Sequence, residues 1–267
     1  ESKNPKVLME FYASKGGVIC GIDEAKSLLT SVLPKVDDEA IANVDNLGDD
    51  VQVWTVSEGD TFEAGDTILR IISRYASFGL YKTSICGILA SSTGWATAAN
   101  ECVKAAGDTT VIAYGARHIH PNVAHIMDYS SIVGGCSSAS TRLGSKQAGR
   151  NAFGNMPHTL PLIFGDTVSA AQAFDHRLDM AVQRIVLVDT FRDEVEESLG
   201  VARALREKLR GVRLDTPKER GGVTPMMVNE VRTRLDQSNF RHVEIYVSGG
   251  FNPTRIRQFV EEQVPVN

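Results

Sequence analysis

The 267-residue sequence predicts an α/β protein with a β-rich N-terminal part and a C-terminal parallel sheet or barrel. After residue 108, short apolar strands recur at intervals of roughly 25–40 residues, each followed by a helical stretch, which is the pattern of parallel β-sheets. Residues 7–75 instead mix short strands and turns, and a long segment rich in small residues follows over 80–106. We therefore expect domains at 1–107 and 108–267.

Composition excludes several classes of protein. The formal charge is −5 and the pI about 5.7, whereas a nonspecific nucleic-acid binder needs a basic surplus. No run of about 18 apolar residues predicts a membrane span, and the charged stretch Glu1 to Lys6 does not resemble a signal peptide. The four cysteines are far apart and form no CxxC pair, which predicts a reduced, cytoplasmic chain with no metal site.

The N-terminal part contains one helix and two strands by pattern. Helical spacing covers Glu24 to Leu33, before Pro34, and alternation predicts a strand over 51–56. Two Gly-Asp turns then precede a strand over 67–72. The Ala-rich segment predicts closely packed helices, in which Gly87 and Gly94 admit near backbone contact.

The C-terminal part predicts strands whose short apolar runs suit burial on both faces. These strands cover 110–114, 160–164, 185–188, 211–214 and 243–247. Helices are expected over 194–210 and 226–235, the second starting at the N-cap and N1 pair Thr224-Pro225.

Polar residues follow several of these strands, where parallel α/β folds bind their ligands. They are Arg117 and His118 after the first strand, Asp189, the pair Arg213 and Asp215, and Ser248-Gly249-Gly250. A helix N-cap explains any one aspartate. It does not explain the whole set, so we expect one binding site at the strand ends.

Each residue type suggests a role. Ser248, Gly249 and Gly250 let backbone N–H groups approach a phosphate, and a helix follows Pro253; the alternative is a simple turn. Arg117, Arg142 and Arg213 offer forked donors for carboxylate or phosphate; the alternative is surface salt bridges. Asp189 and Asp215 suit a cationic centre, a ribose hydroxyl or Mg²⁺.

Three further features are more ambiguous. His158 follows a rigid turn, which suits a nucleophile or acid–base group, although a capping or core histidine fits equally. His118 and His120 have metal-like spacing, but no third ligand stands out. The loop 132–141, with Ser140 and Thr141, lines a pocket wall or serves as a linker, and its Cys136 is interpreted as a packing residue.

Together these motifs resemble the bacterial and archaeal nicotinate phosphoribosyltransferases, relatives of the quinolinate phosphoribosyltransferases. The resemblance covers nearly the whole chain. The matching stretches, in order, are Tyr114 to Pro121, Asp128 to Cys136, Gly154 to His158, Val188 to Phe191, Val212 to Pro217, Arg220 to Pro225 and Val247 to Gly250.

The resemblance implies a type II phosphoribosyltransferase fold, an α/β-barrel with an N-terminal α/β sandwich domain. It implies an NAD-biosynthesis enzyme that joins nicotinate to phosphoribosyl pyrophosphate (PRPP), forming nicotinate mononucleotide and pyrophosphate. It further implies Mg²⁺, a homodimer or higher homo-oligomer, and coupling to ATP hydrolysis through a phosphorylated histidine. Here His158 is that histidine, and Asn155 replaces the family's threonine.

Site residues follow from the same resemblance. His158, Asp189 and Asp215 are predicted to be catalytic. Substrate and PRPP binding is predicted for Arg117, His118, Ser140, Thr141, Arg142, Arg213, Ser248, Gly249 and Gly250. Carboxylates suit this reaction because substitution at the ribose anomeric carbon passes through a cation-like transition state.

Two alternatives remain. A decarboxylating quinolinate phosphoribosyltransferase shares the fold, but the Arg-Lys-Thr string of that family is absent, and Ala116 to Ile119 stands in its place. The second alternative is a non-catalytic barrel or an inactive fragment. It is motivated by relatives that begin earlier and continue past Val266 into a final barrel strand, so that this chain is expected to be a core segment.

Overall fold

The computed structural model describes residues 4–33, 51–154, 156–180 and 182–267. Pro34 and Asn155, which the sequence analysis singled out, lie outside these ranges. The chain forms two compact units. Unit 1 comprises Glu1–Val103 and Val111–Ala152, and unit 2 comprises Lys104–Thr110 and Phe153–Asn267.

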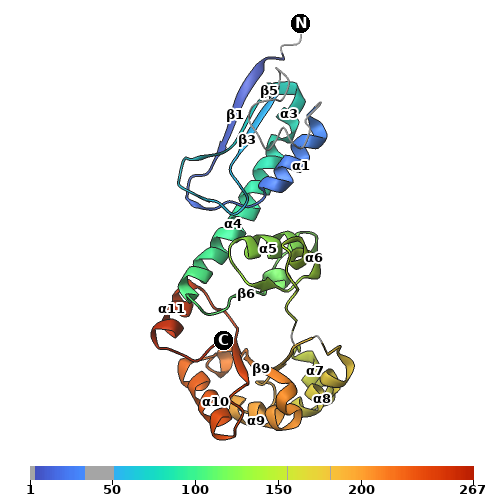
Figure 1. The fold of residues 1–267 in the computed structure, drawn as a ribbon, viewed down its shortest axis with the longest axis vertical. Coiled ribbons are helices and arrows are strands. Elements are labelled where there is room, and N and C mark those ends of the chain that lie inside the picture. The colour runs from blue at the N-terminus through green and yellow to red at the C-terminus, as the bar shows by residue number, and fades with distance from the viewer. Residues whose placement is uncertain (1–3, 34–50, 155, 181) are drawn as a thin grey trace. The chain divides into compact units, whose positions relative to one another are not determined.

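Unit 1 contains an antiparallel sheet in the order β1-β5-β3. Its strands are β1 (Lys6–Tyr12), β5 (Thr67–Arg74) and β3 (Gln52–Thr55). Alternation along them buries one face, with Val53 and Ile71 almost fully enclosed. Helix α1 (Ile22–Val32) contributes Ile22 and Leu29 to the same core, and lies with α3 (Tyr75–Phe78) beside the sheet (Figure 1). The predicted helix and both predicted strands are therefore confirmed.

A second pair of short strands, β2 (Gly17–Val18) and β4 (Thr61–Phe62), places Glu58 against the start of α1. The Glu58 carboxylate accepts hydrogen bonds from the N–H groups of Gly21 (2.9 Å) and Ile22 (2.8 Å). The N-cap residue is Gly21, which adopts a φ of 94° and has no side chain to accept from the first N–H groups of the helix. Glu58 therefore does the capping from a distant turn.

The small-residue segment forms one long helix, α4 (Lys82–Ala106), after the short turn η1 (Gly79–Tyr81). The expectation about Gly87 and Gly94 is wrong, because a Cβ at either position would meet nothing within 4 Å. Beyond α4, unit 1 contains the parallel pair β6 (Ile112–Ala113) and β7 (Ser138–Ala139). Around it lie η2 (Gly115–His118), α5 (Pro121–Val133) and α6 (Arg142–Gln147).

Unit 2 is built on a parallel sheet in the order β10-β9-β8. The strands are β8 (Arg184–Leu187), β9 (Leu209–Leu214) and β10 (Glu244–Val247), each where an apolar run predicted one. Helices α8 (Thr167–Arg177), α9 (Glu194–Leu205), α10 (Pro225–Gln237) and α11 (Pro253–Glu261) accompany them, with short turns η3 (Arg206–Lys208) and η4 (Lys218–Arg220). Strands and helices share one core.

Two predicted elements of unit 2 are wrong. Residues 160–164 form helix α7 (Thr159–Phe164) and no strand. A short apolar run does not separate the two structures, and Pro161 is tolerated in the first turn of a helix but not inside a sheet. The helix predicted to reach Arg210 ends at Leu205, because Arg206 adopts a left-handed φ of 50° and β9 begins at Leu209.

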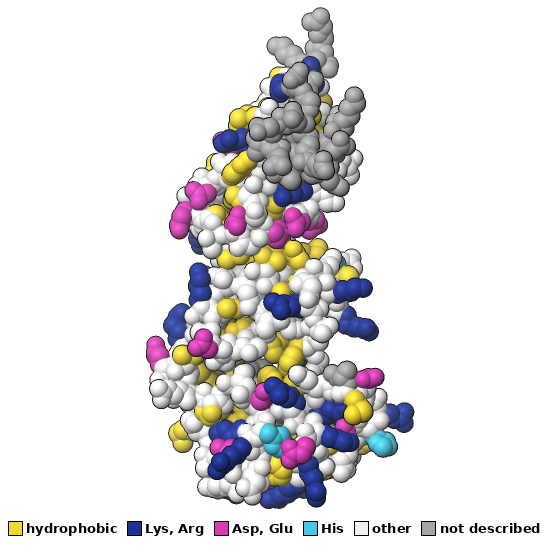
Figure 2. Space-filling view, viewed as in Figure 1, with side chains coloured by type: hydrophobic (Ala, Val, Ile, Leu, Met, Phe, Trp, Pro, Cys, Tyr) yellow, Lys and Arg dark blue, Asp and Glu magenta, His cyan; other side chains and the backbone are white. Residues whose placement is uncertain are grey.

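The surface of unit 2 carries charges of both signs. Figure 2 shows basic, acidic and histidine side chains intermingled over the visible face of this unit.

No helix in the described ranges combines the length and apolar character that crossing a bilayer requires.

Arg184 ties several segments of unit 2 together from the start of β8. Its buried guanidinium donates to Asp175 Oδ1 (2.8 Å) and to the carbonyl groups of Leu178 (3.0 Å) and Asp179 (2.7 Å). Asp175 also accepts a 2.8 Å hydrogen bond from Lys208 Nζ. The hydrogen bonds from Lys208 and then Arg184 hold the pKa of the Asp175 carboxyl below its ordinary value.

We expect Asp175→Asn to lower the free energy of unfolding at pH 7 by about 2 kcal/mol, because the buried Arg184 loses its carboxylate. The stabilising contribution of Asp175 is present above the ordinary pKa of about 4 and is lost as the pH falls through the lower pKa of the folded state. Urea unfolding of both proteins between pH 7 and pH 3 should show the difference shrinking. A difference that stays constant would contradict the assignment.

The exposed ion pair between Arg192 and Glu196 offers the control. Glu196→Gln should leave the free energy of unfolding nearly unchanged at either pH, since solvent screens exposed pairs.

Candidate active site

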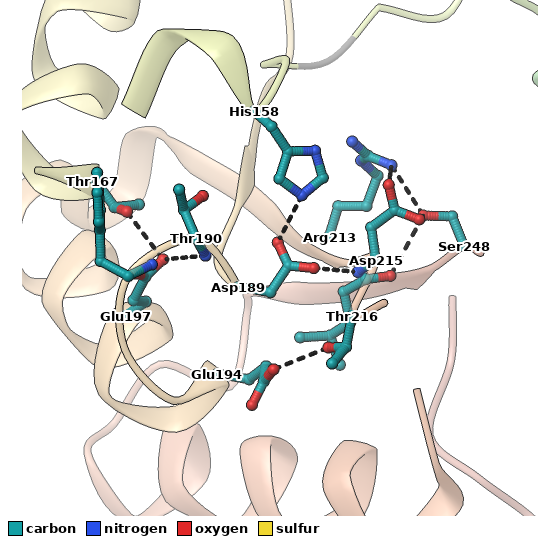
Figure 3. A network of polar contacts seen from close by, with 12 residues as sticks. His158, Thr167, Asp189, Thr190, Glu194, Glu197, Arg213, Asp215, Thr216 and Ser248 are labelled. Carbon is teal, nitrogen blue, oxygen red and sulfur yellow. Dashed lines mark hydrogen bonds and ion pairs between the residues drawn. The ribbon is translucent and has the colours of Figure 1, made fainter. Parts of the chain in front are cut away.

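The parallel register of unit 2 brings three polar strand ends to one edge of the sheet. Asp189 follows β8, Asp215 follows β9 and Ser248 follows β10 (Figure 3). Backbone bonds extend the ladder past the strand ends, from Val188 N to Arg213 O (3.3 Å) and from Ser248 N to Leu214 O (2.9 Å). The side chains predicted from sequence are thus neighbours in space, as parallel pairing requires.

Asp215 is held by two partners. Arg213, two residues earlier on the same face of β9, donates from Nη1 to Asp215 Oδ2 (2.9 Å) and to Ser248 Oγ (2.8 Å). Ser248 Oγ also lies 2.9 Å from Asp215 Oδ1. The guanidinium, the carboxylate and the hydroxyl form a closed triangle, so Arg213 compensates the charge of Asp215 at the sheet edge.

Asp189 is buried, and its two oxygens differ. Oδ2 accepts a 2.9 Å hydrogen bond from the Asp215 N–H, which links the two aspartates directly. His158 Nε2 lies 3.2 Å from Oδ1, yet no donor reaches Oδ1 with hydrogen-bond geometry. Asp189 therefore pairs with His158 after the end of β8, and its side chain is fully buried.

The turn after β10 combines two glycines with the start of a helix. Gly249 and Gly250 adopt φ values of 93° and 72°, which residues with a Cβ rarely adopt. A Cβ at Gly249 would lie 3.2 Å from Asp215 Oδ1, so the turn passes close to the carboxylate. Helix α11 starts directly afterwards, capped by Asn252, and Arg255 donates to the Gly249 carbonyl (2.8 Å). These groups favour negative charge beside the turn.

The remaining predicted residues form a separate group in unit 1. Arg117 and His118 lie in η2 after β6, while Ser140, Thr141 and Arg142 follow β7, so they gather at two adjacent parallel strand ends. Both arginines and His118 are exposed. Buried Asp128 fixes the second stretch by accepting from Thr141 N (2.6 Å) and Ser140 Oγ (3.2 Å).

Sequence reasoning missed the side chains that hold the strand-end loops of unit 2. Glu194 accepts from Thr216 Oγ1 (2.8 Å) and pairs with Arg220 (3.3 Å), whose Nη1 donates to Asp189 O (3.0 Å). Glu197, one helical turn further along α9, accepts from the loop after Asp189. Glutamates are common in the first turn of a helix, where they interact favourably with the helix dipole, so their presence alone indicates no other role. Only the burial of Glu194 and Glu197 in the structure distinguishes them.

No metal-binding cluster stands out in the described ranges, and Cys136 does not have the properties of a reactive thiol. No group of three or more His, Cys, Asp or Glu side chains there is arranged to hold a metal. Burial, followed by the nearby Cys102 and Asp128, raises the pKa of Cys136 to about 12, which disfavours the thiolate and agrees with a packing role.

Comparisons with known proteins relate the whole chain to one family. The model of the quinolinate phosphoribosyl transferase N-terminal domain matches residues 1–93, and that of the C-terminal domain matches residues 95–266. The predicted domain division at residue 107 stays a prediction. The fold is the type II phosphoribosyltransferase fold, as predicted.

Individual relatives support this relationship. A solved nicotinate-nucleotide pyrophosphorylase from Pyrococcus furiosus is 36% identical, with a TM-score of 0.86 over 98% of this chain and 64% of its own. A human nicotinic acid phosphoribosyltransferase shares the fold at 20% identity, with a TM-score of 0.75 over 99% of this chain and 68% of its own. The nicotinate phosphoribosyltransferase pncB2 of Mycobacterium tuberculosis is 27% identical over 80% of this chain and 46% of its own length. The chain thus spans about half the length of that curated relative.

The expectation of an ATP-coupled nicotinate phosphoribosyltransferase is wrong, because both matching family models are those of the quinolinate enzyme. The absence of an Arg-Lys-Thr string favoured the nicotinate enzyme, and this indication was misleading. A carboxylate-binding site can draw its donors from several elements, so the absence of one contiguous string does not exclude this family. The roles predicted for the individual site residues stay predictions. By both of its domain models, the chain belongs to the quinolinate phosphoribosyltransferase family.

Proposed function

We propose that the chain transfers the phosphoribosyl group of PRPP to quinolinate and releases CO₂, forming nicotinate mononucleotide and pyrophosphate. The observation that carries this proposal is the joint edge of β8, β9 and β10 within a quinolinate phosphoribosyltransferase family fold. That edge combines two carboxylates, a guanidinium and a glycine turn. The carboxylates suit the positive charge that develops on the ribose during the reaction. The guanidinium and the glycine turn suit the phosphates of PRPP.

The two aspartates are assigned to the reacting ribose. As the pyridine nitrogen forms its bond to the anomeric carbon and pyrophosphate leaves with its electron pair, positive charge grows on the sugar. Buried carboxylates nearby stabilise that charge, and they also accept hydrogen bonds from ribose hydroxyls. Oδ1 of Asp189 is assigned to such a contact, with His158 Nε2 3.2 Å from the same oxygen.

Mg²⁺ fits this site as a companion of PRPP. Asp189 and Asp215 supply the carboxylate oxygens that Mg²⁺ prefers, and the substrate's phosphates would supply others. When bound, Mg²⁺ neutralises charge on the leaving pyrophosphate. The carboxylates alone are too few for an all-protein cage, which agrees with the lack of a three-ligand cluster in the described ranges.

The other predicted residues complete the assignment. Ser248, Gly249 and Gly250 are assigned to the 5′-phosphate, beside the start of α11. Arg213 is assigned to compensate the negative charge of the PRPP phosphates. In unit 1, Arg117, His118 and Arg142 are assigned to substrate anions, with Ser140 and Thr141 as hydroxyl donors. A homodimer remains a further proposal, which light scattering of the purified protein would test.

The substrate assignment has a direct test. The protein is incubated with PRPP, Mg²⁺ and either quinolinate or nicotinate, with and without ATP. We expect nicotinate mononucleotide and an equal amount of CO₂ from quinolinate, at a rate that ATP does not change. Product from nicotinate alone would overturn the proposal, and no product from either substrate would favour a non-catalytic chain.

For Asp189, we expect Asp189→Asn to reduce kcat by roughly 100-fold, because the neutral amide no longer stabilises the cation-like transition state. Steady-state kinetics with quinolinate and PRPP measures this change. Asp193→Asn is the matched control, since Asp193 only caps α9 through Glu196 N (2.8 Å) and asparagine caps as well. A similar fall in kcat for both variants would refute the role of Asp189.

A further inference from the structure

Glu197 is a buried carboxylate with an unusual set of partners. Its side chain lies on α9 in a residue only 4% exposed, and no ion pair reaches it within the described part of the chain. It accepts instead from Thr167 Oγ1 (2.9 Å) and from three successive backbone N–H groups, those of Thr190 (3.3 Å), Phe191 (2.7 Å) and Arg192 (2.9 Å). These four donors compensate a charge that would otherwise be costly to bury.

The three backbone donors belong to the loop that leaves Asp189. Phe191 and Arg192 are exposed, so their side chains do not anchor the loop in the core. Arg220 contributes from outside, through its hydrogen bonds to Asp189 O (3.0 Å) and Arg192 O (3.4 Å). The Glu197 carboxylate is therefore the buried group that fixes the direction of the backbone at the end of β8.

Helix capping does not explain Glu197. The Asp193 carboxylate already caps α9 by accepting from Glu196 N (2.8 Å). Glu197 lies further into the helix, and its oxygens point to the loop and to α8, away from the first N–H groups of its own helix (Figure 3). Its hydrogen bonds link α9 to α8 and to the loop after β8.

The consequence concerns the Asp189 carboxylate. One of its oxygens accepts from Asp215 N and the other lies 3.2 Å from His158 Nε2, so the direction of the carboxylate also depends on the backbone that carries it. We infer that Glu197 is a positioning residue for this reaction, which aligns Asp189 with the reacting ribose through the N–H groups of residues 190–192. This inference rests on the proposed function, in which Asp189 faces the ribose.

The test compares Glu197→Leu with Glu196→Leu, the same change at the exposed neighbouring position (side chain 54% exposed). We expect Glu197→Leu to reduce kcat by roughly 10- to 100-fold, because small displacements of a reacting group have effects of that size. Glu197→Gln should recover most of the loss, since its amide oxygen still accepts from Phe191 and Arg192 while its NH₂ group faces the Thr167 hydroxyl. Glu196→Leu should change kcat less than about twofold.

A double-mutant cycle separates positioning from general stability. If Glu197 acts through Asp189, Glu197→Leu should reduce kcat less than about threefold in the Asp189→Asn background. Equal reductions in the two backgrounds would overturn the inference. Should Glu197→Leu fail to fold, Glu197→Asp replaces it in the cycle, because it withdraws the carboxylate from the loop while keeping the charge.

Hydrogen exchange at the loop amides tests the role of Glu197 without requiring enzymatic activity. Absence of turnover in the unaltered protein would reject the proposed function alone. In that case the amides of residues 190–192 should still exchange at least tenfold faster in Glu197→Leu than in Glu196→Leu. Unchanged exchange at these amides would overturn the inference.

Discussion

The position of β9 between two parallel neighbours is the constraint on which the candidate active site depends. Leu209, Val212 and Leu214 are fully buried, whereas Arg213 faces the site with Asp215. Because side chains alternate along a strand, a slip of one residue would move Arg213 and Asp215 to the other face. The apolar residues of β9 thus set the register that brings Asp189, Asp215 and Ser248 to one edge.

Carboxylates then fix loops that the sheets leave open. Glu58 accepts from the start of α1, Asp128 from the stretch after β7, and Glu197 from the stretch after β8. In each case a side chain outside the stretch accepts from backbone N–H groups that secondary structure does not satisfy. A loop held in this way needs few apolar residues of its own, which keeps polar side chains available at the strand ends.

Sequence patterns predicted the parts that depend on local periodicity. The strands of unit 2 were evident from their apolar runs, and their polar ends located Asp189, Asp215 and Ser248. The strand predicted over 160–164 was wrong because a short apolar run also suits a helix, as α7 shows. Glu194 and Glu197 were missed because a charged helix start gives no sign of burial, and because their threonine partners Thr216 and Thr167 are 22 and 30 residues distant.

The substrate was the least predictable property, since related phosphoribosyltransferases share the chemistry of PRPP and differ mainly in how they bind a carboxylate. Arg117 and His118, which are predicted to bind substrate, are exposed, and the sequence does not give the directions of their side chains. Local spacing does not determine such directions. The match of both family models along the chain was therefore more informative than any single string of residues.

The way Glu197 holds its loop has a consequence for evolution. It binds main-chain N–H groups, which every residue except proline provides, and so it places no demand on the side chains of Phe191 and Arg192. Both side chains are exposed beside the candidate site. These positions can therefore change chemistry without moving Asp189, which makes the loop a natural place for selection, or a protein engineer, to alter ligand preference while the scaffold stays intact.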